Sequence, residues 1–234
     1  MKNLPPRVFV VVAAFNEEPR IERVLADLKR HGYRDVIVVD DHSVDLTSAL
    51  AKRAGATVIR HARNRGQGAA LRTGIHAALR KGADIIVTFD GDGQHRAAEI
   101  QRFVAPIAAG TAQVAFGSRF LGNAPGMPKH KLVTLKGSIL VERALLKVKL
   151  TDVHNGFRAL SRDAARRIKI TCDRMAHASE IVAEVHEKRI PFVEVPVTIV
   201  YDEYARRKGQ TVFNAFPILG EILRMKRARK NAKR

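Results

Sequence analysis

Short runs of β-branched and other apolar residues recur along the first half of the chain, with amphipathic stretches between them. The apolar runs, each predicted to be a strand, cover residues 7–15, 35–41, 56–61, 84–90 and 112–120. The amphipathic stretches, predicted to be helices, cover residues 19–32, 46–55 and 68–82, and each ends on a glycine, which commonly terminates a helix. Strands that alternate with helices predict an α/β domain with a mainly parallel central sheet flanked by helices.

The regular alternation loosens after residue 121. A loop containing Gly and Pro (GNAPGMPKHK, 122–131) precedes a helical stretch over residues 132–149. Two further helices are predicted over 162–170 and 179–190, and a final strand over 191–201, which we expect Pro196 to break because proline cannot donate a backbone hydrogen bond.

Polar residues follow three of the predicted strands at the point where each strand ends: Asn16 and Glu17, then Asp40 and Asp41, then Asp90 and Asp92. Carboxyl ends of parallel strands meet at one edge of a sheet, where ligands bind in such folds. Two carboxylates separated by a single residue repel each other and are costly to desolvate, so we expect a cation beside Asp90 and Asp92. For Asp41 a second interpretation stays open, because it also precedes the helix predicted over 46–55 and is of a type that caps helices.

The formal net charge of +19 indicates an anionic partner, which charge alone does not identify. A nucleic-acid partner is disfavoured, because the acidic strand ends would repel phosphates and the chain has only three Tyr and no Trp for stacking on bases. No apolar run approaches the roughly 20 residues that cross a bilayer, and Glu17 and Glu18 follow the first run too closely for a secretory signal. The single cysteine, Cys172, favours a reducing compartment.

Seven stretches, in order along nearly the whole chain, resemble the family 2 glycosyltransferases with the GT-A fold. The resemblance is closest to the branch that includes dolichyl-phosphate mannose synthase and the bacterial polyprenyl-phosphate glycosyltransferases. The stretches are VVAAFNEE (11–18), VVDDHSVDLT (38–47), RNRGQGAALRTGI (63–75), FDGDGQH (89–95), GSRF (117–120), DVHNGFRAL (152–160) and EVPVTIVYDEYARRKGQT (194–211).

The resemblance implies a donor site with a divalent metal, Mg²⁺ or Mn²⁺. Asp90, Asp92 and Gln94 match the family's metal motif, in which Asp92 and Gln94 would hold the metal and Asp90 would support the donor. Such metals prefer oxygen ligands and often take only one or two carboxylates, with substrate phosphates completing the shell. The nucleotide-binding positions of the family fall on Ala13, Phe15, Glu17, Asp41, Asp90, Gly91 and Asp92. At Ala13 and Phe15 the family has proline and tyrosine, and Phe15 also fits a core aromatic residue.

The resemblance also implies an acceptor site. A hydroxyl acceptor needs a general base, whereas a phosphate is already anionic and needs cations to hold it. We predict that the acceptor phosphate is bound by Arg119, Lys131 and Arg206. The predicted catalytic residues are Arg119 and Asp92. Another stretch that flanks the acceptor site in the family contains Arg158. The chain departs from the family at Lys131 and Leu135, where an arginine and a serine are frequent, and at Asn155, where serine is usual. Asp152 is a candidate base for a hydroxyl acceptor, with a structural role as the alternative.

We therefore predict a catalytic domain over residues 1–211 and an amphipathic, polybasic extension over 212–234. The predicted reaction is the inverting, metal-dependent transfer of a hexose, of mannose or glucose type, from a GDP- or UDP-sugar to a polyprenyl phosphate such as dolichyl or undecaprenyl phosphate. The extension favours a peripheral location at the cytoplasmic face of a membrane, through an anionic lipid surface or an integral membrane partner. The alternative is a soluble enzyme of the same fold that acts on a hydroxyl acceptor in polysaccharide or glycoconjugate synthesis.

Overall fold

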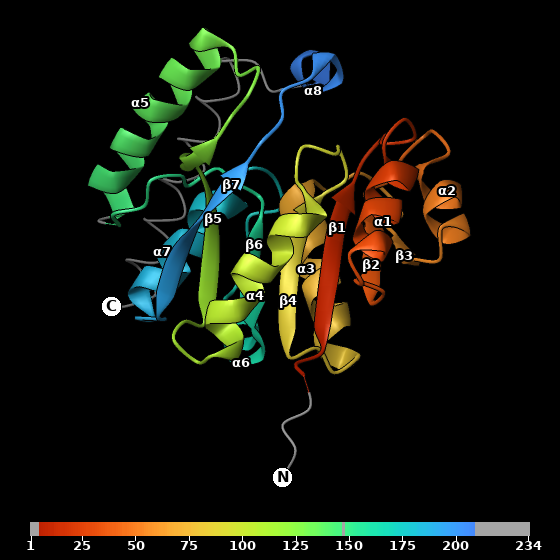
Figure 1. Cartoon of the computed structure of the whole chain (residues 1–234), viewed down its shortest axis with the longest axis horizontal. Coiled ribbons are helices and arrows are strands. Elements are labelled where there is room, and N and C mark those ends of the chain that lie inside the picture. The colour runs from red at the N-terminus through yellow and green to blue at the C-terminus, as the bar shows by residue number, and fades with distance from the viewer. Residues whose placement is uncertain (1–4, 147, 209–234) are drawn as a thin grey trace.

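A seven-stranded sheet in the order β3-β2-β1-β4-β6-β5-β7 forms the centre of the molecule (Figure 1). The structure is a computed structural model that describes residues 5–146 and 148–208, without the side chains of residues 145, 146 and 206–208. The strands are β1 (Val8–Ala14), β2 (Val36–Asp40), β3 (Thr57–Arg60), β4 (Ile85–Asp90), β5 (Val114–Asn123), β6 (Arg158–Ser161) and β7 (Phe192–Thr198). Only β6 pairs antiparallel with its neighbours, so the predicted mainly parallel α/β sheet is confirmed.

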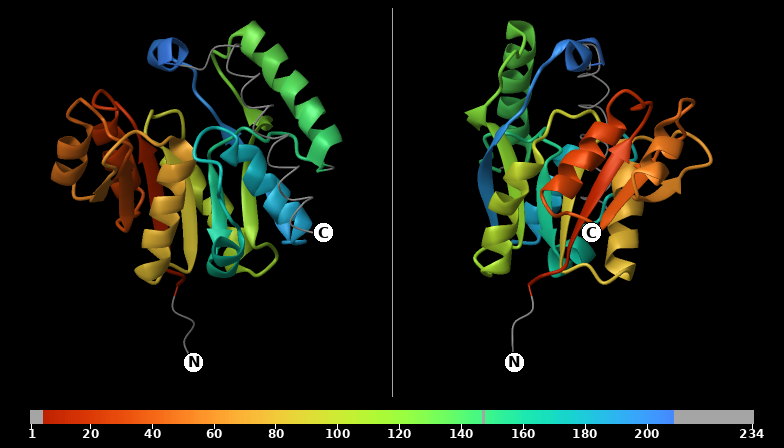
Figure 2. Two further views of the ribbon diagram at one scale, coloured as in Figure 1. Left: turned by 180° about the vertical axis from the view of Figure 1, so that it is seen from behind. Right: turned by 45° about the vertical axis from the view of Figure 1, so that its right-hand side comes forward.

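Helices cover both faces of this sheet, and Figure 2 shows α3, α6 and α7 on the face opposite α1 and α4. The helices are α1 (Ile21–Arg30), α2 (Thr47–Arg53), α3 (Gln67–Arg80), α4 (Ile100–Ala108), α5 (Lys129–Leu146), α6 (Arg162–Arg167), α7 (His177–Glu187) and α8 (Glu203–Lys208). A short 3₁₀ turn, η1 (Ala97–Glu99), leads into α4. Gly32, Gly55 and Gly82, which follow α1, α2 and α3, have φ values of 87°, 90° and 85°, a backbone conformation that suits glycine and ends a helix.

The core has two parts because side chains alternate between the faces of each strand. In β1, Phe9 and Val11 pack with α3, α6 and α7, whereas Val10 and Val12 pack with α1 and α4. All four side chains are at most 2% exposed. This two-sided burial explains why the first strands are continuous apolar runs in the sequence rather than alternating ones.

Three of these helices and strands, α4, β6 and α8, are absent from the sequence predictions, and the predicted break of the last strand is wrong. The helix α4 contains Pro106, and β6 is only four residues long and begins with an arginine, so neither carries a strong periodic signal. The predicted break at Pro196 does not occur, since β7 continues through it. This strand lies at the edge of the sheet and pairs only with β5, where a proline needs no second partner strand.

The carboxyl ends of the parallel strands all point to the side of the sheet that α5 and α8 overhang, opposite the end where the N-terminus leaves (Figure 1). The side chains that follow β1, β2 and β4 in sequence therefore meet under these two helices. The predicted extension over 212–234 lies outside the described residues.

Gly74 tests how closely α3 packs on the sheet. A Cβ atom at this position would lie 2.2 Å from Val11 Cγ1 and 3.1 Å from Val39 Cγ2. We expect Gly74→Ala to lower the free energy of unfolding by about 1–3 kcal/mol, because the core would be overpacked. Urea denaturation measures the change.

Gly137 in α5 is the matched control, because a Cβ atom there would meet nothing within 4 Å. The same substitution at Gly137 should raise the free energy of unfolding by up to about 1 kcal/mol, since alanine favours a helix over glycine. Equal effects at the two positions would contradict the packing argument.

Candidate active site

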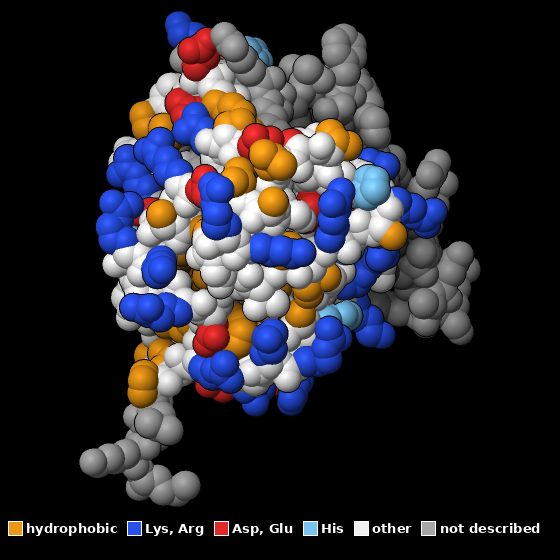
Figure 3. All heavy atoms as spheres, turned by 90° about the vertical axis from the view of Figure 1, so that its right-hand side faces the viewer, with side chains coloured by type: hydrophobic (Ala, Val, Ile, Leu, Met, Phe, Trp, Pro, Cys, Tyr) orange, Lys and Arg blue, Asp and Glu red, His pale blue; other side chains and the backbone are white. Residues whose placement is uncertain are grey.

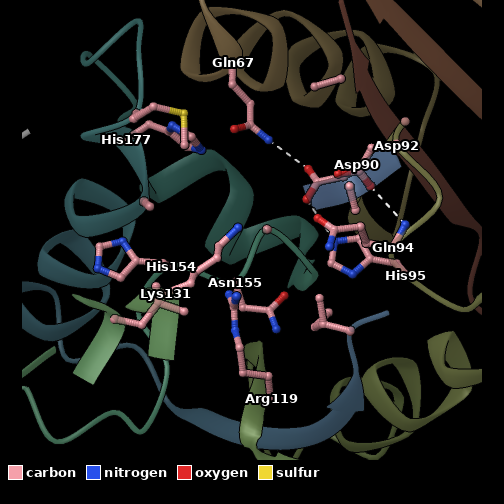
Figure 4. Close-up of a pocket in the computed structure, with 18 of the residues that line it drawn as sticks. Gln67, Asp90, Asp92, Gln94, His95, Arg119, Lys131, His154, Asn155 and His177 are labelled. Atoms are coloured by element: carbon pink, nitrogen blue, oxygen red, sulfur yellow. Dashed lines mark hydrogen bonds and ion pairs between the residues drawn. The ribbon is translucent and has the colours of Figure 1, made fainter. Parts of the chain in front are cut away.

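A cavity of about 830 Å³ opens at the carboxyl edge of the sheet beneath α5. It is bounded by the ends of β1, β2 and β4, by α5 and by the segment that leads into β6 (Figure 4). The predicted site residues that line it are Ala13, Phe15, Glu17, Asp41, Asp90, Gly91, Asp92, Gln94, Arg119 and Lys131. The remaining predicted residue, Arg206, lies in α8, and its side chain is outside what the structure describes. The fold thus gathers residues more than 100 positions apart, and their roles stay predictions.

Asp90 is held by two side chains that the sequence analysis did not single out. Gln67 Nε2 donates a hydrogen bond to Asp90 Oδ1 at 2.8 Å, and His95 Nε2 lies 2.9 Å from Asp90 Oδ2. Burial acts to raise the pKa of Asp90, but the hydrogen bond from His95 and the nearby positive charge of Arg158 bring the pKa below its usual value. Asp90 is therefore an ionised carboxylate with both oxygens engaged.

Asp92 differs from Asp90 in its electrostatics. Burial, the charge of Asp90 and, more weakly, that of Glu17 raise the pKa of Asp92 to about 6. Its Oδ1 accepts a hydrogen bond from the backbone N–H of Gln94 at 2.9 Å. The Gln94 side chain donates through Nε2 to Val200 O at 3.0 Å, which leaves its amide oxygen as the acceptor. A carboxylate destabilised by like charge, with an amide oxygen beside it, is suited to a cation.

The two nucleotide positions on the β1 loop differ in burial. Glu17 is buried, and its Oε2 accepts a hydrogen bond from the Tyr204 hydroxyl at 2.9 Å. Phe15 is 41% exposed and lines the cavity, so the interpretation of this side chain as a core residue is wrong. Gly91 packs closely, because a Cβ atom there would lie 3.3 Å from Ala13 O and from Glu17 Cγ.

The Asp41 carboxylate holds the loop before α3. Its oxygens accept hydrogen bonds from the backbone N–H groups of Arg65 and Gly66, and Oδ1 lies 2.7 Å from His61 Nδ1. It does not cap α2, where instead Asp45 Oδ1 accepts a hydrogen bond from the Thr47 backbone N–H at 3.0 Å. Asp41 thus lines the cavity as a fixed acceptor.

Arg119 and Lys131 converge on one aromatic ring. The Arg119 guanidinium donates through Nε to Asp152 Oδ2 and through Nη1 to the Tyr201 hydroxyl, each at 2.6 Å. The Lys131 ammonium lies 4.8 Å from the centre of the Tyr201 ring, a cation–π contact. Burial and the charge of Arg119 lower the pKa of Lys131, whereas the charge of Asp92 opposes this shift. Arg119 and Lys131 thus line one cavity through a shared contact with Tyr201, and Arg119 is 8% exposed and ion-paired with Asp152.

Two further residues named in the sequence analysis prove to be buried. Asp152 is 1% exposed and pairs with Arg119, which favours the structural role over that of a general base. Arg158 is 2% exposed and donates to the carbonyl oxygens of Asn155 and Val153, so it shapes the cavity floor instead of presenting a surface cation to a phosphate.

Comparison with known proteins agrees with this arrangement. The sequence profile described as "Glycosyl transferase family 2" matches residues 9–169. The chain belongs to this family. It is 38% identical over 223 residues to an uncharacterized protein of Methanocaldococcus jannaschii, covering 94% of this chain and 92% of that one.

Two relatives have names that specify a dolichyl or polyprenol compound. This family 2 glycosyltransferase is 30% identical to the UDP-N-acetylglucosamine–dolichyl-phosphate N-acetylglucosaminyltransferase of Methanococcus voltae, covering 94% of this chain and 96% of the relative. It is also 30% identical to the polyprenol monophosphomannose synthase of Mycolicibacterium smegmatis, covering 84% and 78%. The predicted resemblance is therefore confirmed.

Solved structures confirm the GT-A fold. Glucosyl-3-phosphoglycerate synthase from Mycobacterium tuberculosis, in complex with Mn²⁺, UDP and phosphoglyceric acid, superposes with a TM-score of 0.70 at 18% identity and covers 93% of this chain and 78% of that one. Among the described residues of the family 2 enzyme, no helix is long and apolar enough to cross a membrane.

The metal that the fold family implies was tested against the donor atoms present. In the described part of the enzyme, no three His, Cys, Asp or Glu side chains lie close enough together to hold a metal by themselves. Asp92 and the Gln94 amide oxygen nevertheless fit a Mg²⁺ or Mn²⁺ ion, because such ions accept one or two protein oxygens and take further ligands from a bound diphosphate. The residues are consistent with a metal that binds together with its substrate.

Glu142 in α5 is a cavity residue that the sequence analysis missed. It is 3% exposed, and its Oε1 accepts a hydrogen bond from Ser179 Oγ at 2.8 Å. It stands on the helix face that carries Lys131, Leu135 and Ser138, a spacing of three to four residues that was readable in the sequence. Burial, only partly offset by this hydrogen bond and by Arg158, raises the pKa of Glu142 from 4.5 to about 7.

The stability of the enzyme should respond to this raised pKa. Because Glu142 binds its proton more tightly in the folded than in the unfolded chain, its burial costs little below pH 4.5, and the cost grows as the pH rises to about 7. We expect Glu142→Gln to raise the free energy of unfolding relative to the wild type at pH 8, by up to about 3 kcal/mol, and by much less at pH 5. Denaturant titrations at both pH values measure this difference.

Glu187→Gln in α7 is the matched control, since that side chain is exposed. Its effect should stay within about 0.5 kcal/mol at either pH. A Glu142→Gln effect of the same size at pH 5 and pH 8 would show that ionisation of Glu142 does not limit stability.

Proposed function

We propose that this enzyme transfers a hexose, with inversion and with the help of Mg²⁺ or Mn²⁺, from a GDP- or UDP-sugar to a polyprenyl phosphate. The observation that carries the proposal is the meeting of an acidic and a cationic group in one cavity. Asp92 and Gln94 supply oxygens on one side, and Arg119 and Lys131 supply cations that converge on Tyr201.

The donor half of the proposal assigns the diphosphate to the acidic group. Asp92 and Gln94 would hold the metal, which when bound neutralises charge on the departing nucleoside diphosphate. Asp90, fixed between Gln67 and His95, would orient the donor through its carboxylate. Ala13, Phe15, Glu17 and Asp41 would surround the nucleoside. Solved neighbours crystallised with Mn²⁺ and UDP support this assignment.

The acceptor half assigns the lipid phosphate to Arg119 and Lys131. A phosphate oxygen is anionic at neutral pH, so it can attack the anomeric carbon without a general base, provided that cations position it. Asp152, the predicted base for a hydroxyl acceptor, is instead engaged by Arg119. One relative is named for transfer of N-acetylglucosamine to dolichyl phosphate and two are named for mannose transfer that involves polyprenol or undecaprenyl phosphate, which favours this acceptor class over a hydroxyl.

The basic surface fits an anionic membrane as the third partner. Figure 3 shows Lys and Arg side chains spread over the face formed by α1, α2 and β3, which includes the exposed Lys29, Arg30, Lys52 and Arg53. Each such charge near an anionic lipid surface contributes on the order of 1 kcal/mol of attraction. We propose peripheral attachment to the membrane that contains the acceptor.

The substitution Asp92→Asn distinguishes a loss of catalysis from a loss of stability. Removing one of two repelling, partly buried carboxylates should leave the fold at least as stable at pH 8, whereas metal-dependent transfer should fall at least about a hundredfold because a metal ligand is lost. The assay follows radiolabelled sugar from GDP- and UDP-sugars into a polyprenyl phosphate phase with Mn²⁺ or Mg²⁺. Near-normal transfer by the variant would overturn the metal assignment.

Lys131→Gln tests the acceptor assignment. We expect the KM for polyprenyl phosphate to rise about tenfold or more, because a cation near the phosphate is lost, while the affinity for UDP or GDP with Mn²⁺ stays unchanged. Lys136→Gln, at an exposed position of the same helix, should leave both quantities unaltered. If wild-type enzyme hydrolyses a donor but labels no lipid, the acceptor is a hydroxyl compound instead.

A further inference from the structure

The cavity is also lined, beside the groups assigned to metal and phosphate, by Glu142, His154, Asn155, Arg158 and His177. We call these five residues the polar floor. Its residues come from α5, from the segment before β6, from β6 itself and from α7, and Figure 4 shows His154, Asn155 and His177 around the same cavity as Asp90 and Lys131. The predicted donor and acceptor chemistry assigns no role to Glu142, His154, Asn155 or His177, and the structure removes Arg158 from the residues that could present a surface cation to the acceptor.

Several buried atoms of the polar floor lack hydrogen-bond partners among the described residues. They are Glu142 Oε2, Asn155 Nδ2 and Arg158 Nη1. Glu142, Asn155 and Arg158 are each at most 3% exposed. Buried polar atoms are almost always paired in folded proteins, so a cluster of unpaired ones beside a cavity points to a ligand that pairs them.

The two histidines of the polar floor are neutral and act as acceptors. Burial lowers the pKa of His154 and of His177 to about 4. His177 Nδ1 lies 2.7 Å from Arg174 O, so this nitrogen carries the proton and Nε2 remains an acceptor. Ser138 Oγ donates to Leu135 O and therefore accepts from His154 Nε2, 2.9 Å away, which leaves His154 Nδ1 as an acceptor.

The polar floor thus offers hydrogen-bond donors and acceptors together. The unpaired donors belong to Asn155 and Arg158 and the acceptors to Glu142 and the two histidines, so a phosphate, which only accepts, would pair part of them and a hydrocarbon chain would pair none. A polyhydroxylated ring fits, because each of its hydroxyl groups both donates and accepts a hydrogen bond.

The polar floor also begins directly behind the donor group. A Cβ atom at Gly156, next to Asn155, would lie 2.7 Å from Asp90 Oδ2, and Arg158 interacts electrostatically with both Asp90 and Glu142. A sugar is covalently joined to the diphosphate that Asp92 and Gln94 would hold, so it must lie within one ring of them. The polar floor adjoins Asp90 and can form hydrogen bonds with hydroxyl groups, so it meets this requirement.

We propose that Glu142, Asn155 and Arg158, with His154 and His177, bind the hydroxyl groups of the transferred hexose and determine which sugar the enzyme accepts. This inference rests on the proposed function, because it requires a nucleotide-sugar donor. Glu142 and Asn155 are the residues to vary, because Arg158 holds two backbone carbonyl oxygens, whereas Asn155 Oδ1 accepts only the Phe157 backbone N–H, a role that a serine hydroxyl also serves.

Isothermal titration calorimetry tests the proposal by binding rather than by turnover. Wild-type enzyme is titrated with UDP, GDP, UDP-glucose, UDP-galactose, UDP-N-acetylglucosamine, GDP-mannose and GDP-glucose, each with Mn²⁺, and then Glu142→Gln is titrated with the same ligands. We expect Glu142→Gln to reduce the affinity ratio between the preferred sugar and its epimer by about tenfold or more. Binding of UDP or GDP should change by no more than about twofold, because neither carries the sugar.

A second substitution and a control keep the result interpretable. Asn155→Ser removes one unpaired donor and keeps a small polar side chain, so it should also reduce the affinity ratio between the preferred sugar and its epimer. This variant carries the test if Glu142→Gln does not fold. Exposed Glu187→Gln should leave every affinity unaltered.

The outcomes separate the two proposals. An unchanged sugar ratio in both variants, or an equal loss for every sugar and for the free nucleotide, would overturn the polar floor as the sugar site while leaving the donor site intact. If wild-type enzyme binds UDP or GDP but no nucleotide sugar more tightly, then the proposed function itself fails and the sugar site fails with it.

Discussion

The clustering of carboxylates at one edge of the sheet is the constraint on which the rest of the site depends. Asp90 and Asp92 end the same strand, and Glu17 approaches them from β1, so like charges accumulate where the sheet shields them from water. The fold holds Asp90 ionised by giving it Gln67 and His95, but it leaves Asp92 with a raised pKa. Such an arrangement is costly for stability unless a cation binds there, which is why it indicates function.

The same reasoning applies to the buried polar atoms that lack hydrogen-bond partners. Among the described residues, the buried atoms without hydrogen-bond partners are His95 Nδ1, Gln113 Oε1, Glu142 Oε2, Asp152 Oδ1, Asn155 Nδ2 and Arg158 Nη1. All but Gln113 belong to residues that line the cavity or pair with Arg119. Unsatisfied groups are therefore concentrated where a substrate can satisfy them, while the two apolar core clusters beneath contain the bulk of the packing.

The cations of the cavity depend on a ring that no local pattern identifies. Tyr201 follows β7, accepts a hydrogen bond from Arg119 and lies beneath Lys131, so one side chain fixes the relative positions of two charges from β5 and α5. Asp152 neutralises part of this charge and keeps the Arg119 guanidinium in one orientation. The departure from the family at Lys131 thus keeps a cation at this position.

The sequence by itself determined the alternation of strands and helices, the strand-end carboxylates and the family, because these depend on local periodicity and on contiguous motifs. It did not determine β6, whose four residues carry no periodic signal, or the pairing of Gln67 with Asp90 and of Arg119 with Asp152 and Tyr201. Glu142 was missed although its helical spacing from Lys131 was readable, because an acidic residue in a helix is ordinarily solvated. Only the tertiary structure decided which of these side chains line one cavity and which form ion pairs with each other, since burial and pairing depend on contacts between residues far apart in the chain.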